Sequence, residues 1–398
     1  MDPIRNPFAP GAGTPPPELA GRDALRETVR IAVARTRIGR PAKSLLMVGL
    51  RGVGKTVLLD RMRDDAEATG VHTLRIEAPE GRSLPGILLP QLRLALLRLS
   101  RNERAEAAAK RALRALAGFF GAIKVKYGDV EVGLDYEPER GLADNGDLDQ
   151  DLQALLEEAA KAAQKAETAL VLFVDELQYV PEEELAALIT AIHFLSQRQL
   201  PLMMVGAGLP QLRGQMGRAK SYAERLFDFP ELTSLDRENA ALAIRKPLEE
   251  EGVAIEPEAL EDLLRQTQGY PYFLQEWGKH TWEVAEKSPI TKADTEHATV
   301  LALAALDASF FRVRLDRLTP AEVEYLWVMA VLGPGPHRSG DIAEKHQRAV
   351  QSLAPIRHNL IRKGMIYSPT YGDTAFTVPL FDAYMRRVMP DRPIPKEA

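Results

Sequence analysis

At 398 residues the chain is too long for one ordinary domain, and 45% hydrophobic with 27% charged residues is typical of a soluble globular protein of two or three domains. The absence of cysteine excludes disulfides and thiolate sites and favours a cytoplasmic protein. The sequence has no H-E-x-x-H pattern, so no zinc site is predicted. It has no apolar run long enough to span a bilayer, so no membrane partner is predicted. A net charge of −5 argues against the whole protein binding nucleic acid electrostatically, although residues 311–398 carry 13 Lys+Arg against 9 Asp+Glu, a local net charge of +4.

The chain begins with a segment rich in proline and glycine. Residues 1–18 predict a flexible N-terminal arm with no core of its own. Residues 19–34 predict a helix with Leu25, Val29 and Val33 on one face. Arg22 lies just upstream of a glycine loop, so it is a candidate for nucleotide contact as well as an ordinary surface residue.

That glycine loop reads GLRGVGKT and fits the phosphate-binding pattern G-x-x-x-x-G-K-[ST] at every fixed position. A buried strand is predicted at residues 44–49 and a helix at 55–68, so the loop lies between strand and helix as the chemistry requires. A chance glycine turn is the alternative, and the flanking elements disfavour it. Lys55 would reach the β- and γ-phosphates, and the Thr56 hydroxyl would ligate Mg²⁺. The predicted nucleotide-binding residues of the loop are Gly49, Leu50, Arg51, Gly52, Val53, Gly54, Lys55, Thr56 and Val57.

A second strand is predicted at residues 71–78 and is followed by two helical stretches that end near residue 116. The hydrophobic period then changes from 3.6 to 2 over residues 122–137, around Gly128-Asp129. This pattern predicts a β-hairpin inserted in the nucleotide-binding domain. A helix is predicted next, at residues 151–166.

An uninterrupted apolar run at residues 169–177 predicts a strand buried on both faces, and it contains the pair Asp175-Glu176. In P-loop ATPases we expect such a strand beside the phosphate-loop strand. Asp175 would then hold Mg²⁺ through water, and Glu176 would orient and deprotonate the attacking water. The alternative is a pair of carboxylates favoured by a helix N-terminus.

The fourth predicted strand, residues 200–208, ends in glycine and alanine with no polar side chain. Residues 221–232 then predict a short helix and a fifth strand. Arg225 in this helix is the best candidate for an arginine finger, with an ion pair to an acidic neighbour as the alternative.

Residues 236–311 are predicted to be purely helical, with four amphipathic helices. Gly269-Tyr270-Pro271 lies between two of them, and Pro271 is either a helix break or a contact to the base or ribose. Residues 291–294 read TKAD, like a guanine-reading motif, but they stand at a helix start, so we interpret Thr291 as an N-cap and favour ATP over GTP.

Three short helices, at residues 318–333, 339–346 and 352–364, precede a hairpin at 365–379, and together they predict a winged helix. Basic residues cluster on or beside the third helix, which would enter a major groove of double-stranded DNA. Winged helices also bind proteins, and basic helices are often only solvated faces, so both alternatives stay open. The candidate DNA-binding residues are Arg348, Arg357, His358, Arg362 and Lys363.

Together the phosphate loop, the strand ending in Asp-Glu, the helical segment with Gly269-Tyr270-Pro271 and the terminal winged helix resemble an AAA+/STAND-type ATPase, most closely the origin-recognition and archaeal-ATPase-like group. The resemblance implies an α/β P-loop core with a parallel five-stranded sheet, a helical lid that clamps ATP, and a C-terminal winged helix. It divides the chain into an arm (1–18), a core (19–235), a lid (236–311) and a winged-helix domain (312–398). It also implies that Gly21-Arg22-Asp23 lies near adenine and that Pro271 contacts the nucleotide.

Two departures from that family bear on function. The polar residue expected after the fourth strand is missing, and the lid has Tyr272 where initiators present an arginine after a G-x-x spacing. Both favour a slow switch that reports whether ATP or ADP is bound. We expect this switch to use Mg²⁺ and to couple to DNA through the winged helix. The alternative is an ATP-controlled signalling or assembly module, in which the nucleotide controls a homo-oligomer or a partner protein. A nucleotide kinase is disfavoured because the sequence contains no acceptor domain.

Overall fold

The computed structural model describes residues 1–11, 13–78, 80–127, 136–390 and 392 of the chain. They form two compact units, each described here by itself. The first, the α/β unit, contains Arg22–Gly49 and Lys55–Leu232. The second, the helical unit, contains Met1–Gly21, Leu50–Gly54 and Thr233–Ala398.

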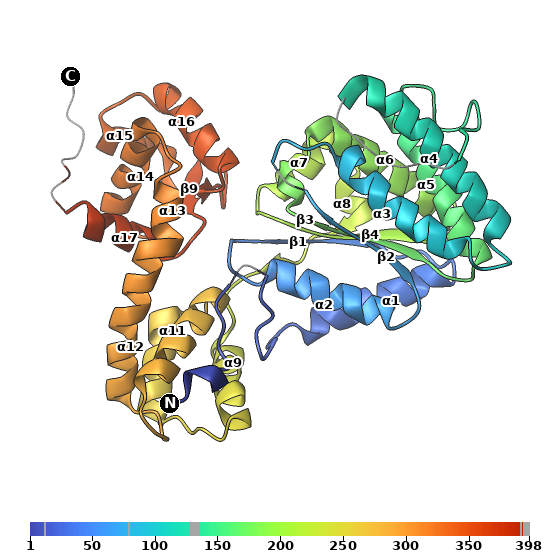
Figure 1. The fold of residues 1–398 in the computed structure, drawn as a ribbon. Coiled ribbons are helices and arrows are strands. Elements are labelled where there is room, and N and C mark those ends of the chain that lie inside the picture. Colours follow the sequence, from blue (N-terminus) through green and yellow to red (C-terminus); the bar gives the residue numbers. More distant parts are fainter. Residues whose placement is uncertain (12, 79, 128–135, 391, 393–398) are drawn as a thin grey trace. The chain divides into compact units, whose positions relative to one another are not determined.

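A parallel sheet is the centre of the α/β unit, as predicted (Figure 1). Its order is β2-β3-β4-β1-β5, and β6 also pairs with β1, so that β5 and β6 together occupy the fifth position. Pro230 lies between these two short strands. The strands are β1 (Ser44–Gly49), β2 (His72–Glu77), β3 (Leu170–Asp175), β4 (Leu202–Gly208), β5 (Phe227–Asp228) and β6 (Glu231–Leu232).

The expectation that the Asp-Glu strand lies beside the phosphate-loop strand is wrong. Strand β4 lies between them, and Gly206 at its centre pairs with Leu46 of β1 and with Val174 of β3. Every residue of β1, β3 and β4 is buried, as expected for parallel strands covered on both faces. In parallel strands the carboxyl ends share one edge, so β1 and β3 still present their last residues on the same side.

Helices cover both faces of this sheet. Figure 1 shows α1 and α2 on one face and α3 to α6 on the other. A 3₁₀ turn, η2 (Leu177–Tyr179), directly follows β3. The helices are α1 (Asp23–Arg37), α2 (Lys55–Glu67), α3 (Leu84–Leu99), α4 (Glu106–Tyr127), α5 (Leu148–Lys165), α6 (Glu182–Gln197), α7 (Leu212–Ala219) and α8 (Ala223–Leu226).

The predicted hairpin at 122–137 is not confirmed in its first half. Residues 122–127 continue α4. Extending an established helix adds one hydrogen bond for each residue that it fixes, whereas a hairpin must be nucleated anew, so the alanine-rich helix extends over the alternating pattern. Residues 128–135 lie outside the described part of the chain.

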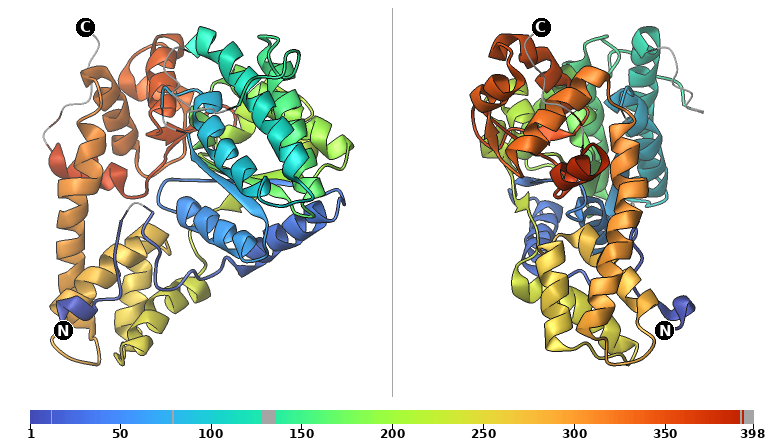
Figure 2. Two further views of the ribbon diagram at one scale, coloured as in Figure 1. Left: turned by 45° about the vertical axis from the view of Figure 1, so that its right-hand side comes forward. Right: turned by 90° about the vertical axis from the view of Figure 1, so that its left-hand side faces the viewer.

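The helical unit contains α9 (Arg237–Glu250), α10 (Pro257–Thr267), α11 (Pro271–Val284) and α12 (Lys292–Ala305). Figure 2 shows α12 running on as one long rod into the last part of the chain. The rod passes through a π-helical turn, η3 (Leu306–Phe311), into α13 (Arg312–Leu315). The remaining elements are α14 (Pro320–Leu332), β7 (His337–Arg338), α15 (Ser339–His346), α16 (Val350–Arg362), β8 (Ile366–Tyr367), β9 (Asp373–Phe376) and α17 (Phe381–Val388), with an antiparallel strand order of β7-β9-β8.

The N-terminal segment, predicted to be a flexible arm, packs along α11 instead. The Phe8 ring is buried against Gly278, where a Cβ would come within 2.6 Å of it. Trp282 Nε1 donates to the carbonyl of Asp2 at 2.8 Å, and Asn6 Nδ2 donates to that of Lys279 at 3.1 Å. One aromatic ring and several polar contacts, including the ion pair of Arg5 with Glu251, hold the segment, and such contacts give no periodic signal in the sequence. Among the residues described by the structure, no helix is long and apolar enough to cross a membrane.

Candidate nucleotide site

The phosphate loop joins β1 to α2. Gly52 and Gly54 have φ angles of +83° and +90°, a region that favours glycine. Lys55 begins α2, and its side chain is 6% exposed. Its Nζ donates a 2.9 Å hydrogen bond to the carbonyl of Gly49. The ammonium is therefore held against the carbonyl that ends β1, and its contact with phosphate oxygens stays a prediction.

The acidic side of the site is built at the end of β3. Asp175 is 2% exposed and accepts a hydrogen bond from Thr56. It also accepts from the backbone N–H of Glu176 at 2.9 Å and from Arg75 Nη2 at 3.4 Å. Burial raises the pKa of Asp175, and the hydrogen bond from Thr56 partly opposes that rise. The loop hydroxyl and the strand carboxylate therefore meet, although β4 separates their strands.

A hydroxyl and one carboxylate are the protein oxygens that a P-loop site offers to Mg²⁺, with phosphate oxygens and water completing the octahedron. In the described part of the chain, no group of three or more His, Cys, Asp or Glu side chains gathers as a metal site. The pair Thr56 and Asp175 therefore fits a magnesium ion that arrives with its nucleotide, and does not resemble an all-protein metal cage.

Glu176 follows Asp175 in the left-handed conformation, with φ of 54°, at the entrance to η2. Its Oε2 accepts a hydrogen bond from Nε2 of Gln178. Sequence reasoning missed Gln178, because a glutamine two residues after an acidic pair has no motif of its own. It also missed Arg75, which is hydrogen-bonded to both Asp60 (2.6 Å) and Asp175 across the strand.

The helical unit contributes contacts to the loop segment Leu50–Gly54, which belongs to the same unit. The backbone N–H of Tyr272 donates to the carbonyl of Gly52 at 3.1 Å. A Cβ at Gly52 would come within 3.1 Å of both Tyr270 and Tyr272, so the apex of the loop is closely covered. The signal for Tyr272 in the sequence was its place directly after the Gly269-Tyr270-Pro271 segment.

Arg314 of α13 is a further cation in this part of the helical unit. Its guanidinium lies 3.7 Å from the centroid of the Phe310 ring, and that ring stacks on Tyr272 at 4.6 Å between centroids. Burial lowers the pKa of Arg314 to about 10, and the nearby positive charge of Arg51 contributes to the same shift. Arg314 lies three residues after the predicted lid and far along the chain from Gly269, so the G-x-x spacing could not identify it.

Three more predicted site residues are placed without a contact that tests their roles. Arg22 is the N-cap residue of α1, and its side chain makes no capping hydrogen bond. Pro271 occupies the first turn of α11. Arg225 lies in the four-residue helix α8 with an exposed side chain.

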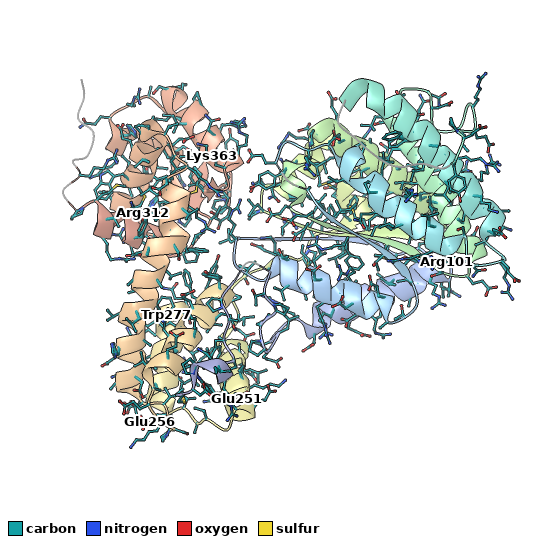
Figure 3. The ribbon with its side chains drawn as sticks, viewed as in Figure 1. Arg101, Glu251, Glu256, Trp277, Arg312 and Lys363 are labelled. Carbon is teal, nitrogen blue, oxygen red and sulfur yellow. The ribbon has the colours of Figure 1, made fainter. Side chains whose placement is uncertain are left out.

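The candidate DNA-binding residues separate into two groups. Arg357 is engaged within its own domain, with Nε donating to Thr374 at 2.8 Å and Nη2 to the carbonyl of Asp373 at 3.0 Å. Lys363, labelled in Figure 3, pairs with Glu322 at 2.7 Å. The exposed members of the set are Arg348, His358 and Arg362.

Comparisons with known proteins agree with the fold and the loop. Residues 18–205 match a family model described as an AAA ATPase domain, and residues 308–385 match one described as a domain of unknown function, DUF8462. No curated protein matches the sequence significantly.

The Walker-type ATPase PABY2304 of Pyrococcus abyssi is similar in structure, with a TM-score of 0.57 at 16% identity over 94% of this chain and 97% of that one. The RuvB Holliday junction branch migration motor of Thermotoga maritima matches with 14% identity and a TM-score of 0.45, over 94% of this chain and 96% of that one. The ORC1 protein of Aeropyrum pernix, solved in complex with DNA, matches with 14% identity and a TM-score of 0.43, over 94% of each chain. The first likeness shows the fold alone, and the two lower scores support no conclusion about this chain. Residues 18–205, a little under half of the chain, thus match an AAA ATPase domain in sequence, and the sheet order and the phosphate loop agree with that match.

Proposed function

We propose that this protein binds Mg–ATP and hydrolyses it slowly, as a switch between an ATP state and an ADP state. The observation that carries the proposal is the hydrogen bond between Thr56 and Asp175, because it brings the two predicted magnesium-binding groups together at the end of β3. Mg²⁺ would neutralise the charge that develops on the transferred phosphoryl group. The capping box at Thr291 and Asp294 accounts for the TKAD segment without guanine recognition and so supports ATP over GTP.

Phosphate binding and proton transfer are assigned to different groups of the chain. The backbone N–H groups of the loop and the Lys55 ammonium bind the phosphates. The Glu176 carboxylate accepts the proton of the attacking water. Strand β4 ends in Gly208 with no polar side chain to bind the γ-phosphate, and Tyr272 stands where an arginine is expected, so turnover should lie below the usual range of about 1–1000 s⁻¹.

ADP release and nucleotide affinity test this proposal on purified protein. Lys55→Ala should weaken ATP binding by about 10- to 100-fold, as expected for the loss of charge-assisted hydrogen bonds. Glu176→Gln should bind ATP normally and release little ADP. Lys43→Ala is the matched control, since this exposed lysine pairs only with Asp228 in the structure and should leave both values unchanged. Equal ADP release by the wild type and Glu176→Gln would exclude the proposed role of Glu176.

We further propose that the segment after η3 is a winged helix that couples the nucleotide state to double-stranded DNA. Helices α14, α15 and α16 with the β7-β9-β8 sheet support this interpretation. The exposed Arg348, His358 and Arg362 provide the cationic groups for phosphate contact, and the net charge of this region supports it. The alternative partner is a protein, which would predict strong nucleotide-dependent assembly and no DNA affinity above a non-specific background.

Arg225 supports a proposal about assembly. An exposed arginine on a short helix of the α/β unit can serve a neighbouring subunit as an arginine finger. Turnover per subunit should then rise with protein concentration and should not rise in Arg225→Ala. A flat profile for the wild type would count against a finger acting between subunits. A cytoplasmic setting is part of the same proposal, supported by the absence of cysteine.

A further inference from the structure

Gln178 connects the Glu176 carboxylate to the end of β4. It lies in η2, two residues after Glu176, and is 7% exposed. Its Nε2 donates to Oε2 of Glu176, and its Oε1 accepts a 3.0 Å hydrogen bond from the backbone N–H of Leu209. A backbone N–H requires an acceptor, so the contact with Leu209 fixes which end of the amide is oxygen and which end faces Glu176.

The glycines of β4 are what allow this connection. A Cβ on Gly208 would lie 2.9 Å from Oε1 of Gln178, and one on Gly206 would lie 2.4 Å from Cδ1 of Leu177. Both distances are shorter than real Cβ contacts, so a side chain at either position would displace the side chain of Leu177 or of Gln178. The strand end that lacks a polar side chain of its own therefore receives one from η2, the amide of Gln178.

The turn that carries Gln178 is itself well supported. Tyr179 N–H donates to the carbonyl of Glu176 at 3.0 Å, and Gln215 Nε2 donates to the carbonyl of Gln178 at 3.2 Å. The backbone around Gln178 is thus held by other groups, and the amide is left to hold the Glu176 carboxylate. An apolar side chain of the same size would fill the same space but would satisfy neither Leu209 nor Glu176.

We infer that Gln178 is a positioning residue for hydrolysis, which fixes the Glu176 carboxylate and ties it to the end of β4 in place of the missing polar side chain of that strand. The inference rests on the proposed function, since it assigns the support of its general base. Nε2 has two hydrogens, and the one that is not directed to Glu176 remains for the attacking water or a phosphate oxygen. A hydrogen bond that orients a base affects the chemical step more than the binding of nucleotide.

The test compares Gln178→Met with the wild type under single-turnover and steady-state conditions in Mg–ATP. Methionine keeps the side-chain volume and removes both hydrogen bonds. We expect kcat to fall about 10- to 100-fold with KM and Tm little changed, the range for losing a hydrogen bond to a charged group. The matched control is Gln215→Met, which removes the contact to the Gln178 carbonyl but none to Glu176, and should keep kcat within about twofold.

Each outcome bears on a separate claim. An unchanged kcat in Gln178→Met, or a raised KM at constant kcat, would overturn the positioning role. An equal loss of kcat in Gln215→Met would assign the effect to the turn as a whole and would overturn it too. If Gln178→Met fails to fold, Gln178→Asn keeps the amide but is one methylene too short to bridge, and full activity in that variant would be decisive against it. A wild type that releases no ADP would contradict the proposed function itself, whereas an active wild type matched by both Gln178 variants would contradict this inference alone.

Discussion

Among single residues, Asp175 has the environment that opposes its negative charge most clearly, because its carboxyl group is buried. Three donors surround it, namely the Thr56 hydroxyl, the Glu176 N–H and Arg75, yet burial still raises its pKa. A carboxylate whose charged form is disfavoured by burial is typical of a site that a cation completes. The metal-free protein should therefore lose free energy of unfolding as the pH rises and this carboxyl group ionises.

The first prediction concerns the pH dependence of stability in EDTA. The unfolded chain releases the Asp175 proton at the ordinary carboxyl pKa, and the folded chain holds it to a higher pH. Stability is therefore lost as pH rises through that interval, and the loss is complete above the folded pKa. Asp175→Asn should raise Tm by a few degrees at about pH 8, and the gain should shrink towards about pH 4. A variant with a lower Tm at every pH would contradict the assigned sign of the shift.

At the scale of elements, the loop between β1 and α2 depends on glycine at its apex. Gly52 combines a φ of +83° with close contact to Tyr270 and Tyr272. Gly52→Ala should cost about 1–2 kcal/mol from backbone strain alone and should weaken ATP binding. Gly217 is the control, because it is exposed in α7 with nothing within 4 Å of an added Cβ, and Gly217→Ala should stabilise the protein by about 0.5–1 kcal/mol. Chemical denaturation and ATP titration of both variants check this, and an unaffected Gly52→Ala would exclude the strained apex.

The start of α12 gives a prediction that separates stability from nucleotide choice. The Thr291 hydroxyl accepts from the N–H of Asp294, and the Asp294 carboxylate accepts from the N–H of Thr291, which confirms the predicted N-cap. Thr291→Ala should cost about 1 kcal/mol in free energy of unfolding and leave the preference for ATP over GTP unchanged. A variant that gains or loses GTP binding would show that the segment reads the base after all.

The sequence predicted those elements whose signals are local. The apolar runs of β1, β3 and β4 and the phosphate loop identified the core and the ends of β1 and β3 at which the predicted site lies. The strand order was not predictable in this way, because no local residue pattern specifies which parallel strands become neighbours, and the position of β4 between β1 and β3 is visible only in the fold. The alternating residues 122–127 extend α4, because lengthening an existing helix is easier than nucleating a new hairpin. The role of Gln178 depends on two glycines about thirty residues away, and only the fold brings them together.

For the molecule as a whole, we propose that the bound nucleotide, ATP or ADP, controls DNA binding. The long rod of α12, η3 and α13 joins the helices next to the loop segment Leu50–Gly54 to the last domain. Phe310, in the η3 turn of this rod, stacks on Tyr272. Phe311 in the same rod stacks on Tyr384 of α17 at 5.1 Å. Aromatic contacts therefore continue from Tyr272, whose backbone N–H donates to Gly52, through Phe310 and Phe311 to Tyr384, and they support the proposed coupling.

Fluorescence anisotropy of a labelled random DNA duplex tests this claim most directly, with Glu176→Gln protein saturated with ATP or with ADP at about 50 mM and about 200 mM salt. We predict binding that differs between the nucleotides and weakens about 10- to 100-fold at the higher salt. Arg348→Ala and Arg362→Ala should reduce it and Arg101→Ala, an exposed arginine of the α/β unit labelled in Figure 3, should not. No binding in either state, or the same affinity in both, would contradict a DNA-coupled switch and would favour a protein partner for the last domain.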